Sequence, residues 1–255
     1  MSTATLSIVK TQLEELGLGF LHGGIETFLH DESRRERPLT ETLADLFDQE
    51  ITQRRQRAAK TRLKLSALPT VKTLEEFKTD EVEGITRKKL NELRTLAFVE
   101  RKENIVLMGP SGLGKSHLLY ALAHLACVEG HTAYHITGSQ LKEDLSRAKE
   151  QNRLRRKLKA LCKPRLLAID EVGYERLNPE EASLFFQLVA QRYEKGSIVI
   201  TTNKSFGQWG ELMGDNAVAT ATLDRLLHHA QVIILKGDSY RLKSRMKLGL
   251  VPPLQ

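Results

Sequence analysis

The fold is decided by the stretch Gly109-Pro110-Ser111-Gly112-Leu113-Gly114-Lys115-Ser116. These eight residues match the pattern G-x-x-x-x-G-K-[ST], in which backbone N–H groups surround a polyphosphate. An apolar run at residues 105–108 predicts a strand before them, and residues 118–129 predict a helix after them. Because an accidental match would rarely have both neighbours, we expect a phosphate-binding loop between a strand and a helix.

Each residue type in this stretch has a physical reason to be there. Glycines allow the backbone to fold tightly around phosphate groups, and the start of the following helix adds partial positive charge. The Lys115 ammonium is expected to reach the β- and γ-phosphates, and the Ser116 hydroxyl is expected to ligate Mg²⁺. The sequence therefore predicts ATP and Mg²⁺ as ligands.

Two acids follow the apolar run at residues 166–169. We expect Asp170 to contact Mg²⁺, directly or through water. Glu171 is then placed to accept a proton from the water that attacks the γ-phosphate. The alternative is a buried strand that simply ends in an acid, but the phosphate-binding loop upstream favours the functional interpretation.

Asn203 follows another apolar run, at residues 197–201. An Asn amide or a Thr hydroxyl at this strand end could orient the attacking water or touch the γ-phosphate, although many strands simply end in a polar turn. We expect Asn203 to have this role. Arg225 lies in a predicted amphipathic helix. It either pairs with a nearby acid such as Asp224, or stabilises transition-state charge at a site in the same or a neighbouring subunit.

His228 and His229 come directly after that segment. Adjacent residues of a helix point in different directions, so we expect these two to make a poor metal pair.

From about residue 104 the sequence alternates between predicted strands and predicted helices. The strands are predicted at residues 105–108, 132–136, 165–169, 197–201 and 232–235, and residues 138–162 are expected as one long helical region. This alternation favours an α/β fold, with a parallel sheet of the P-loop NTPase type between two layers of helices. Only about 20 residues follow residue 235, too few for a helical lid.

Residues 1 to about 70 have a different pattern. Helical spacing is present over residues 5–16 and 39–65, and Leu68-Pro69-Thr70 resembles a boundary. We expect a helical N-terminal domain over residues 1–70, which contacts DNA, a partner protein or a sister subunit. Residues 71–255 are expected to form the ATPase domain.

The formal net charge of +7 favours a polyanionic partner. Residues 147–163 contain eight bases against one acid, and residues 54–64 contain six bases and no acid. A solvated helix face is the ordinary explanation, but such an excess favours contact with a DNA or RNA backbone. The residues expected to make that contact are Arg153, Arg155, Arg156, Lys157 and Lys159. Aromatic residues are not interleaved with the bases, so base stacking is not predicted, and Trp209 is expected to pack in the core.

The sequence contains no apolar run near the ~20 residues that span a bilayer, and its N-terminus lacks a signal-peptide pattern. Its two cysteines, Cys127 and Cys162, have no metal-ligand spacing. Free thiols are typical of a reducing compartment, so we expect a cytoplasmic protein without membrane contact.

Taken together, these segments resemble the IstB family of transposition helper ATPases, relatives of the DnaC-type helicase loaders in the AAA+ superfamily. The resemblance extends from about residue 74 to residue 243. Besides the phosphate-binding loop with His117, it depends on four strings: Leu167-Ala168-Ile169-Asp170-Glu171-Val172-Gly173-Tyr174, Thr201-Thr202-Asn203, Leu223-Asp224-Arg225-Leu226-Leu227-His228-His229 and Gly237-Asp238-Ser239-Tyr240-Arg241-Leu242-Lys243.

The resemblance implies an ATPase that self-assembles on double-stranded DNA, selects target sites and stimulates a partner transposase of the DDE type. It implies nucleotide contacts from residues 109–117, a Walker B pair at Asp170 and Glu171, sensor 1 at Asn203 and an arginine finger at Arg225. The finger would place ATP at the interfaces of a homo-oligomer, and hydrolysis is expected to be stimulated by DNA. Thr202 stands where related sequences often have serine.

A sensor-2 role is not carried over to Arg241, because a lid normally supplies that arginine. The alternative within the superfamily is a DnaC-type replicative helicase loader, which would prefer single-stranded DNA. Outside it, the alternatives are a P-loop phosphotransferase with a small acceptor and a binding protein in which the nucleotide is only structural.

Overall fold

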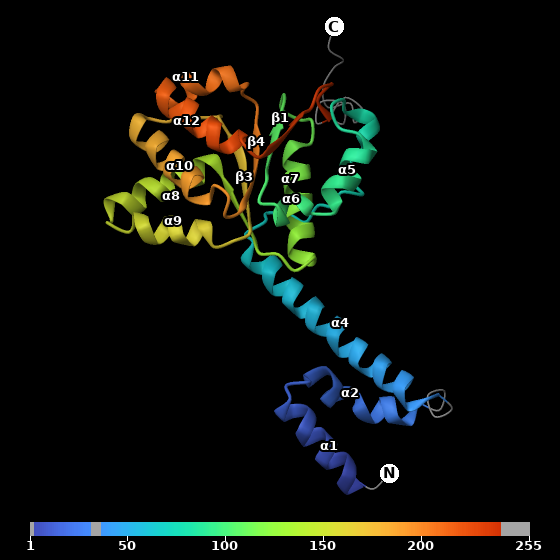
Figure 1. Ribbon diagram of the computed structural model, residues 1–255. Helices are drawn as coiled ribbons and strands as arrows, with labels where there is room; N and C mark the ends of the chain where they lie inside the picture. Colours follow the sequence, from blue (N-terminus) through green and yellow to red (C-terminus); the bar gives the residue numbers. More distant parts are fainter. Residues whose placement is uncertain (1–2, 32–36, 241–255) are drawn as a thin grey trace, which may run out of the picture. The chain divides into compact units, whose positions relative to one another are not determined.

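The computed structural model describes residues 3–31 and 37–240, which divide into two compact units, Met1–Thr61 and Arg62–Gln255 (Figure 1). The division falls inside one long helix, α4 (Leu39–Leu65). Residues that follow the division belong to the larger unit, since Leu63 and Leu68 pack on its core. The compact units divide at residues 61 and 62. The domain boundary expected near residue 70 stays a prediction.

The larger unit contains a five-stranded sheet in the order β2-β3-β4-β1-β5, and all neighbouring strands are parallel. The strands are β1 (Asn104–Met108), β2 (Ala133–Thr137), β3 (Leu166–Val172), β4 (Ser197–Thr202) and β5 (Ala230–Ile234). The predicted parallel α/β sheet is therefore confirmed.

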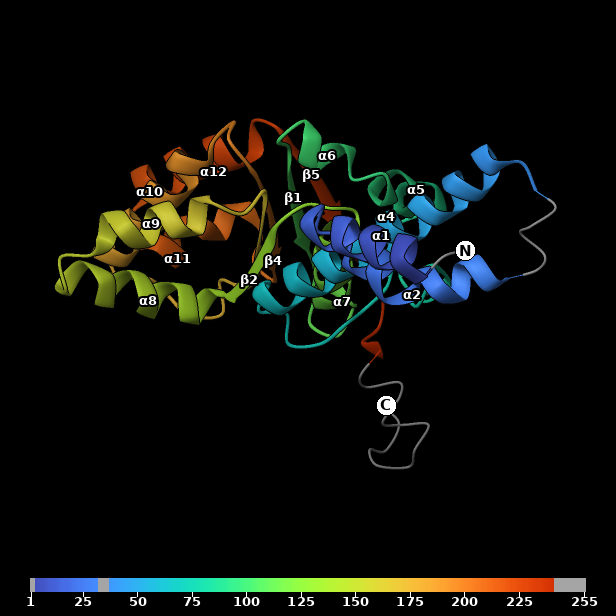
Figure 2. The same cartoon turned by 90° about the horizontal axis from the view of Figure 1, so that it is seen from below.

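Helices cover both faces of this sheet (Figures 1 and 2). One face carries α5 (Arg87–Arg94), α6 (Ala97–Glu100) and α7 (Lys115–Val128). The other carries α8 (Gly138–Glu150), α9 (Leu154–Cys162), α10 (Pro179–Arg192), α11 (Trp209–Met213) and α12 (Asn216–Leu227). Two short 3₁₀ turns, η1 (Thr79–Glu81) and η2 (Phe206–Gln208), join these elements.

The central strands are apolar throughout because both of their faces are buried. In β1, Ile105 and Leu107 belong to the core under α7, whereas Val106 belongs to the core under α8–α12. Trp209 is completely buried in the second core, which confirms that it is a packing residue.

Residues 138–162 form two helices where one long helical region was expected. Helix α8 ends at Glu150, and Asn152 has a left-handed φ of 54° before α9 begins. Asparagine tolerates this conformation better than most residues. The break lets α9 turn back, so that Leu158 and Leu161 join the same core as Leu141 and Leu145 of α8.

The smaller unit contains α1 (Thr3–Glu15), α2 (Gly19–His30) and the first part of α4. Leu21, Ile25, Phe28 and Leu46 form its small core. The buried Glu50 carboxylate accepts hydrogen bonds of 3.1 Å from the N–H groups of Phe20 and Leu21 at the start of α2. Within the described ranges, none of the helices has the length and apolar character needed to cross a membrane.

Candidate active site

The phosphate-binding loop connects β1 to α7, where three glycines have left-handed φ angles. These are 146° at Gly109, 85° at Gly112 and 84° at Gly114. A Cβ on Gly114 would lie 2.7 Å from the Phe77 ring, and a Cβ on Gly109 would lie 2.3 Å from the Leu235 carbonyl oxygen. Other residues would strain this loop and collide with its neighbours, so the backbone conformation requires glycine.

Lys115 and Ser116 occupy the first turn of α7, where N–H groups lack partners inside the helix. The Lys115 side chain is 6% exposed, and its Nζ donates a 2.7 Å hydrogen bond to the Pro110 carbonyl. The ammonium is thereby held above the loop that is expected to surround the phosphates.

Asp170 is the centre of a hydrogen-bonded group at the end of β3. Its Oδ1 accepts from Ser116 Oγ at 2.9 Å and from Thr201 Oγ1 at 2.5 Å. Its Oδ2 accepts from the Tyr120 hydroxyl at 2.8 Å. The carboxylate is 2% exposed, so these bonds fix its orientation.

The oxygens of Ser116 and Asp170 fit a magnesium ion. Mg²⁺ prefers oxygen ligands at about 2.0–2.1 Å in octahedral geometry, which places adjacent ligands about 2.9 Å apart. The observed separation of Ser116 Oγ and Asp170 Oδ1 is 2.9 Å. Ser116 would therefore hold the ion at the cavity wall, with Asp170 behind it as a direct or water-mediated contact, and the ion would screen phosphate charge when bound.

Glu171 lies at an irregularity of β3, where the pairing with β4 shifts between Ile169 and Val172. Its φ is 61°, and its N–H donates a 2.8 Å hydrogen bond to Thr201 Oγ1. Bulges of this kind often re-aim a side chain next to an active site. The exposed Glu171 side chain lines the same cavity as Lys115 and Ser116.

That cavity has a volume of about 490 Å³, a size that suits a nucleotide. Residues 111–117 line one part of it, together with Tyr120, Glu171 and Thr201. The other walls come from segments that sequence reasoning missed: Lys72, Glu76, Phe77, Lys78, Glu81, Val82 and Tyr240.

Long-range contacts hold these missed segments in place. His117 Nε2 lies 2.9 Å from the Thr73 carbonyl oxygen, and its ring meets Phe77 edge-on at 5.7 Å. The Tyr240 N–H donates to the Gly112 carbonyl at 2.9 Å. Sequence spacing carries no signal for these contacts, although Tyr240 lies in one of the strings that resemble a known family.

The polar side chain of β4 that reaches the cavity is Thr201, whereas sequence reasoning had chosen Asn203. Asn203 is exposed just beyond the strand, and among the described residues it is not one that lines the cavity. Thr201 contacts both Asp170 and the Glu171 backbone. Thr201 and Asn203 are two positions apart, so the alternation of side chains along a strand places both on the same face. Alternation alone therefore does not favour Thr201 as the residue that reaches the cavity.

Arg225 lies on α12 with its guanidinium 4.5 Å from the centre of the Phe186 ring, as a cation–π contact. Among the described residues that line the cavity of the same chain, Arg225 is absent. Its guanidinium therefore contacts an aromatic ring in this structure, and the expected pair with Asp224 stays a prediction. Arg241, for which no sensor role was carried over, lies outside the described residues.

The helix that was expected to carry His228 and His229 ends before them, at Leu227, so the expectation that they make a poor metal pair stays a prediction. His228 keeps helical backbone angles and its N–H donates to the Asp224 carbonyl, whereas His229 lies beyond the helix. The two ring centroids lie 4.2 Å apart. Together with Glu194 they offer three metal-ligand atoms within 4.8 Å of one another.

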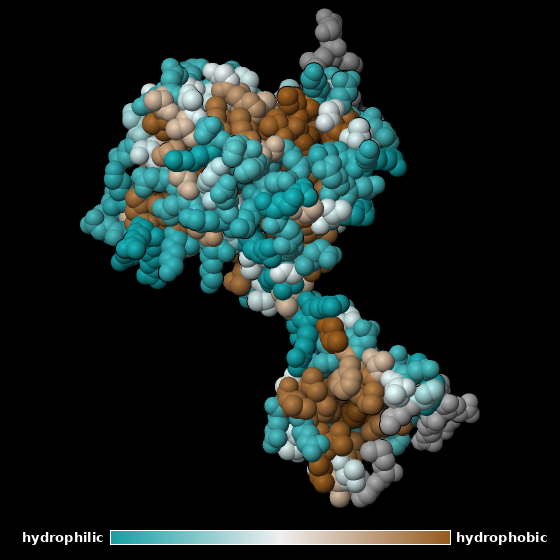
Figure 3. Space-filling view, viewed as in Figure 1, coloured by the Kyte–Doolittle hydropathy of each residue, from teal (hydrophilic) through white to brown (hydrophobic). Residues whose placement is uncertain are grey.

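Four of the five bases expected to contact DNA are exposed on or just before α9: Arg153, Arg155, Arg156 and Lys159. Lys157 differs, since its Nζ lies 2.5 Å from Asp144 of α8. Hydrophilic side chains gather over the region of α8 and α9 in the space-filling view (Figure 3). In the second basic stretch, Arg54 donates to Glu50 and to the Gly17 carbonyl, and Arg62 donates to the Cys127 carbonyl. The guanidinium groups of these two bases are therefore engaged in hydrogen bonds within the protein.

Comparison with known proteins gives matches over most of the chain. The model of the IstB-like ATP binding proteins matches residues 11–248. An ATP-binding protein of insertion sequence IS21 from Pseudomonas aeruginosa is 46% identical over 243 residues, covering 95% of this chain and 92% of that protein. Its counterpart in insertion sequence IS5376 of Geobacillus stearothermophilus is 44% identical over 206 residues, covering 81% and 82%.

Solved structures with a similar fold are more distant in sequence. The DnaC helicase loader matches with a TM-score of 0.51 and 19% identity, over 64% of this chain and 96% of that one. AMPPCP-bound DnaA from Aquifex aeolicus matches with a TM-score of 0.55 and 18% identity, over 73% and 58%. At this identity the likeness concerns the fold alone.

Proposed function

This chain belongs to the IstB-like ATP binding proteins and is a P-loop ATPase; from that premise we propose that it is the helper protein of an insertion sequence. In this role it assembles on duplex DNA with ATP between subunits, selects target sites and stimulates a partner DDE transposase. The names of its relatives, which are ATP-binding proteins of insertion sequences, support the connection with transposition.

The observation that carries the proposal is that the nucleotide cavity and Arg225 lie in different places on the same chain. Lys115, Ser116 and Glu171 line one cavity, with Asp170 hydrogen-bonded to Ser116 beneath it. Arg225 lies on α12 and does not line the cavity of its own chain, as far as the described residues extend. A neighbouring subunit that supplied Arg225 would complete the set, so nucleotide and assembly become coupled.

Within the cavity each residue has a separate task. The loop N–H groups and the Lys115 ammonium bind phosphate oxygens, and Asp170 holds Ser116 in place. Glu171 accepts the proton of the attacking water, for which an exposed carboxylate at the cavity wall is suitably placed. The Thr201 hydroxyl fixes Glu171 by accepting a hydrogen bond from the Glu171 backbone N–H. For Asn203 to act as the proposed sensor, the end of β4 would have to move so that the Asn203 side chain reaches the nucleotide.

Duplex binding is supported by the four exposed bases of the α9 segment. Arginine and lysine side chains bind DNA mainly through phosphates, which gives affinity without base specificity. An arginine-rich surface without aromatic platforms therefore fits a protein that must bind many different target sequences.

A replicative helicase loader is the second candidate, because DnaC has this fold over nearly its whole length. The two insertion-sequence relatives are 46% and 44% identical to this chain, whereas DnaC is 19% identical. We therefore favour the first candidate. The two differ in their ligand: a loader is expected to prefer single strands, and a transposition helper to prefer duplex.

The test measures binding to duplex and single-stranded DNA with ATP, ADP or no nucleotide, and phosphate release with and without DNA. We expect ATP-dependent assembly on duplex and faster phosphate release in its presence. Lys115→Ala should lose ATP binding and assembly, whereas Lys88→Ala, at an exposed position on α5, should retain both. Equal coating of duplex with ATP, ADP and no nucleotide would refute the proposal.

A further inference from the structure

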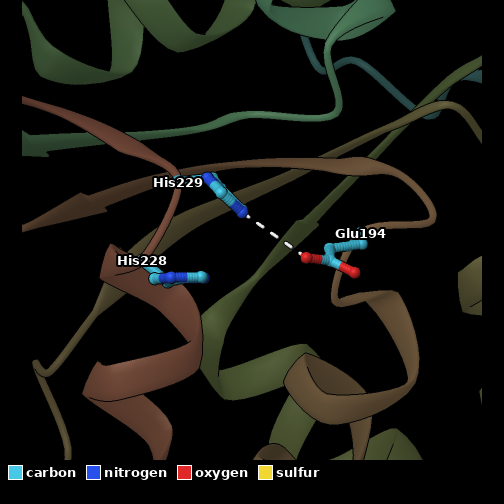
Figure 4. Close-up of side chains that lie close together, drawn as sticks. All are labelled: Glu194, His228 and His229. Atoms are coloured by element: carbon cyan, nitrogen blue, oxygen red, sulfur yellow. Dashed lines mark ion pairs between the residues drawn. The ribbon is translucent and has the colours of Figure 1, made fainter.

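Glu194, His228 and His229 form a cluster of potential metal ligands outside the nucleotide cavity (Figure 4). Each residue offers one ligand atom, and the three atoms lie within 4.8 Å of one another. Figure 4 shows the Glu194 carboxylate and the His229 ring pointing toward each other, with His228 beside them at the end of α12. We propose that these three side chains bind a divalent transition-metal ion of the zinc class.

The distance between two of the ligands already fits such an ion. Zn²⁺ binds imidazole nitrogen and carboxylate oxygen at about 2.0–2.2 Å in tetrahedral geometry, which places two ligands about 3.4 Å apart. His229 Nε2 lies 3.4 Å from Glu194 Oε1. Two imidazoles and one carboxylate form a ligand set that prefers zinc, nickel or copper over magnesium or calcium.

Polar and aromatic neighbours support His228 as a ligand. Its Nδ1 lies 2.5 Å from the Tyr193 hydroxyl, and the two rings stack at 5.8 Å. In the tautomer whose Nδ1–H donates to Tyr193, the Nε2 lone pair is available to a metal. A hydrogen bond at the second ring nitrogen is the usual way in which proteins orient a metal-binding histidine.

Hydrogen bonds from Asn104 fix the backbone that carries His228 and His229. Asn104 donates its N–H to the His229 carbonyl at 2.7 Å and its side-chain amide to the Leu226 carbonyl at 2.9 Å. Asn104 is 8% exposed, so these bonds are shielded from water. Glu194 adopts a left-handed φ of 57° two residues after the end of α10. This is a common way for a helix to end, and it turns the chain toward the cluster.

Two helix ends also favour a cation at this place. Helix α10 ends at Arg192 and α12 ends at Leu227, so the negative ends of both macrodipoles lie within three residues of the ligands. A bound ion would tie these two helix ends together. With three protein ligands, it would keep a fourth position for water or for a group of another molecule.

The experiment titrates the chelator-treated full chain with Zn²⁺ against a chromogenic indicator, with Mg²⁺ in excess and without nucleotide. His229→Gln and Glu194→Gln should each weaken zinc binding at least about tenfold, and Tyr193→Phe about tenfold, because loss of an orienting hydrogen bond has that effect. The matched control is His30→Gln, which changes an exposed histidine of the smaller unit and should bind zinc as the unaltered chain does.

Two further measurements separate this site from misfolding and from thiol binding. Zn²⁺ should raise the melting temperature of the unaltered chain and of His30→Gln, and leave that of His229→Gln unchanged. Bound Co²⁺ should give the absorption of a nitrogen and oxygen site. A thiolate charge-transfer band, or equal zinc affinity in His229→Gln, Glu194→Gln and the unaltered chain, would overturn the proposal. ATP turnover is not needed for either result, so the outcome is independent of the function proposed above.

Discussion

Ser116 Oγ donates a 2.9 Å hydrogen bond to Asp170 Oδ1, although the two residues are 54 positions apart in the sequence. The bond joins the first turn of α7 to the end of β3. It is possible because β1 and β3 are parallel to the intervening β4, so that their carboxyl ends reach the same edge of the sheet. Ligands bind at that edge in open α/β sheets.

Glu171→Gln should leave ATP binding unchanged and lower phosphate release by about 10²–10⁴-fold, since an amide cannot accept the proton of the attacking water. Nucleotide affinity and steady-state turnover measure the two effects separately. The control is Glu175→Gln, which alters an exposed acid that pairs with Lys142 and does not line the nucleotide cavity among its described residues. Full turnover in Glu171→Gln would remove this residue as the base.

Thr201→Val should lower turnover by about 10–100-fold with little change in ATP affinity. The hydroxyl both donates to Asp170 and accepts from the Glu171 N–H, and outer contacts of this kind have effects of that size. Asn203→Ala is the comparison, and we expect its effect to be smaller. The reverse order would restore Asn203 as the polar residue of β4 that acts on the nucleotide.

The phosphate-binding loop, the five strands and the two acids could be predicted because each depends on a local pattern. Thr201 could not, because its contacts with Asp170 depend on the pairing of β3 with β4. The position of His229 outside the helix has a similar origin. Helical spacing was extended past Leu227, but Asn104 binds the carbonyls of Leu226 and His229 and directs the chain into β5.

Arg192→Met should lower the free energy of unfolding by about 3 kcal/mol, because buried carbonyl groups would be left without their donor. The Arg192 guanidinium is 1% exposed and donates to the carbonyls of Leu161, Pro164, Arg165 and Ser197 at 2.8–3.3 Å. Denaturant titration measures the change. Arg176→Met, at an exposed arginine that pairs with Glu211, should change stability by less than about 1 kcal/mol. Equal stability of the two variants would contradict this prediction, and would mean that the four carbonyl groups find other partners, such as water.

Arg225→Ala should abolish most ATP hydrolysis and regain part of it when mixed with Lys115→Ala. Each variant supplies what the other lacks: Lys115→Ala keeps its arginine, and Arg225→Ala keeps an intact nucleotide cavity. An arginine that acts in trans is worth about 10³–10⁵ in turnover in related phosphoryl-transfer proteins. Phosphate release across mixing ratios measures the rescue, and activity that simply averages the two variants would exclude a shared site.

The double reversal Arg155→Glu/Arg156→Glu should weaken duplex binding and flatten its dependence on salt. For each phosphate that the variant no longer neutralises, the slope of log K against log salt should become shallower by about 0.9. The control reverses Lys88 and Lys102, two exposed bases outside α9, and should keep the original slope. Lys157 is unsuitable for this test, because its reversal would also break the ion pair with Asp144 that joins α9 to α8. If both double variants changed the slope equally, net charge and not the α9 surface would account for DNA binding. If only the α9 variant changes it, the affinity for duplex belongs to that surface.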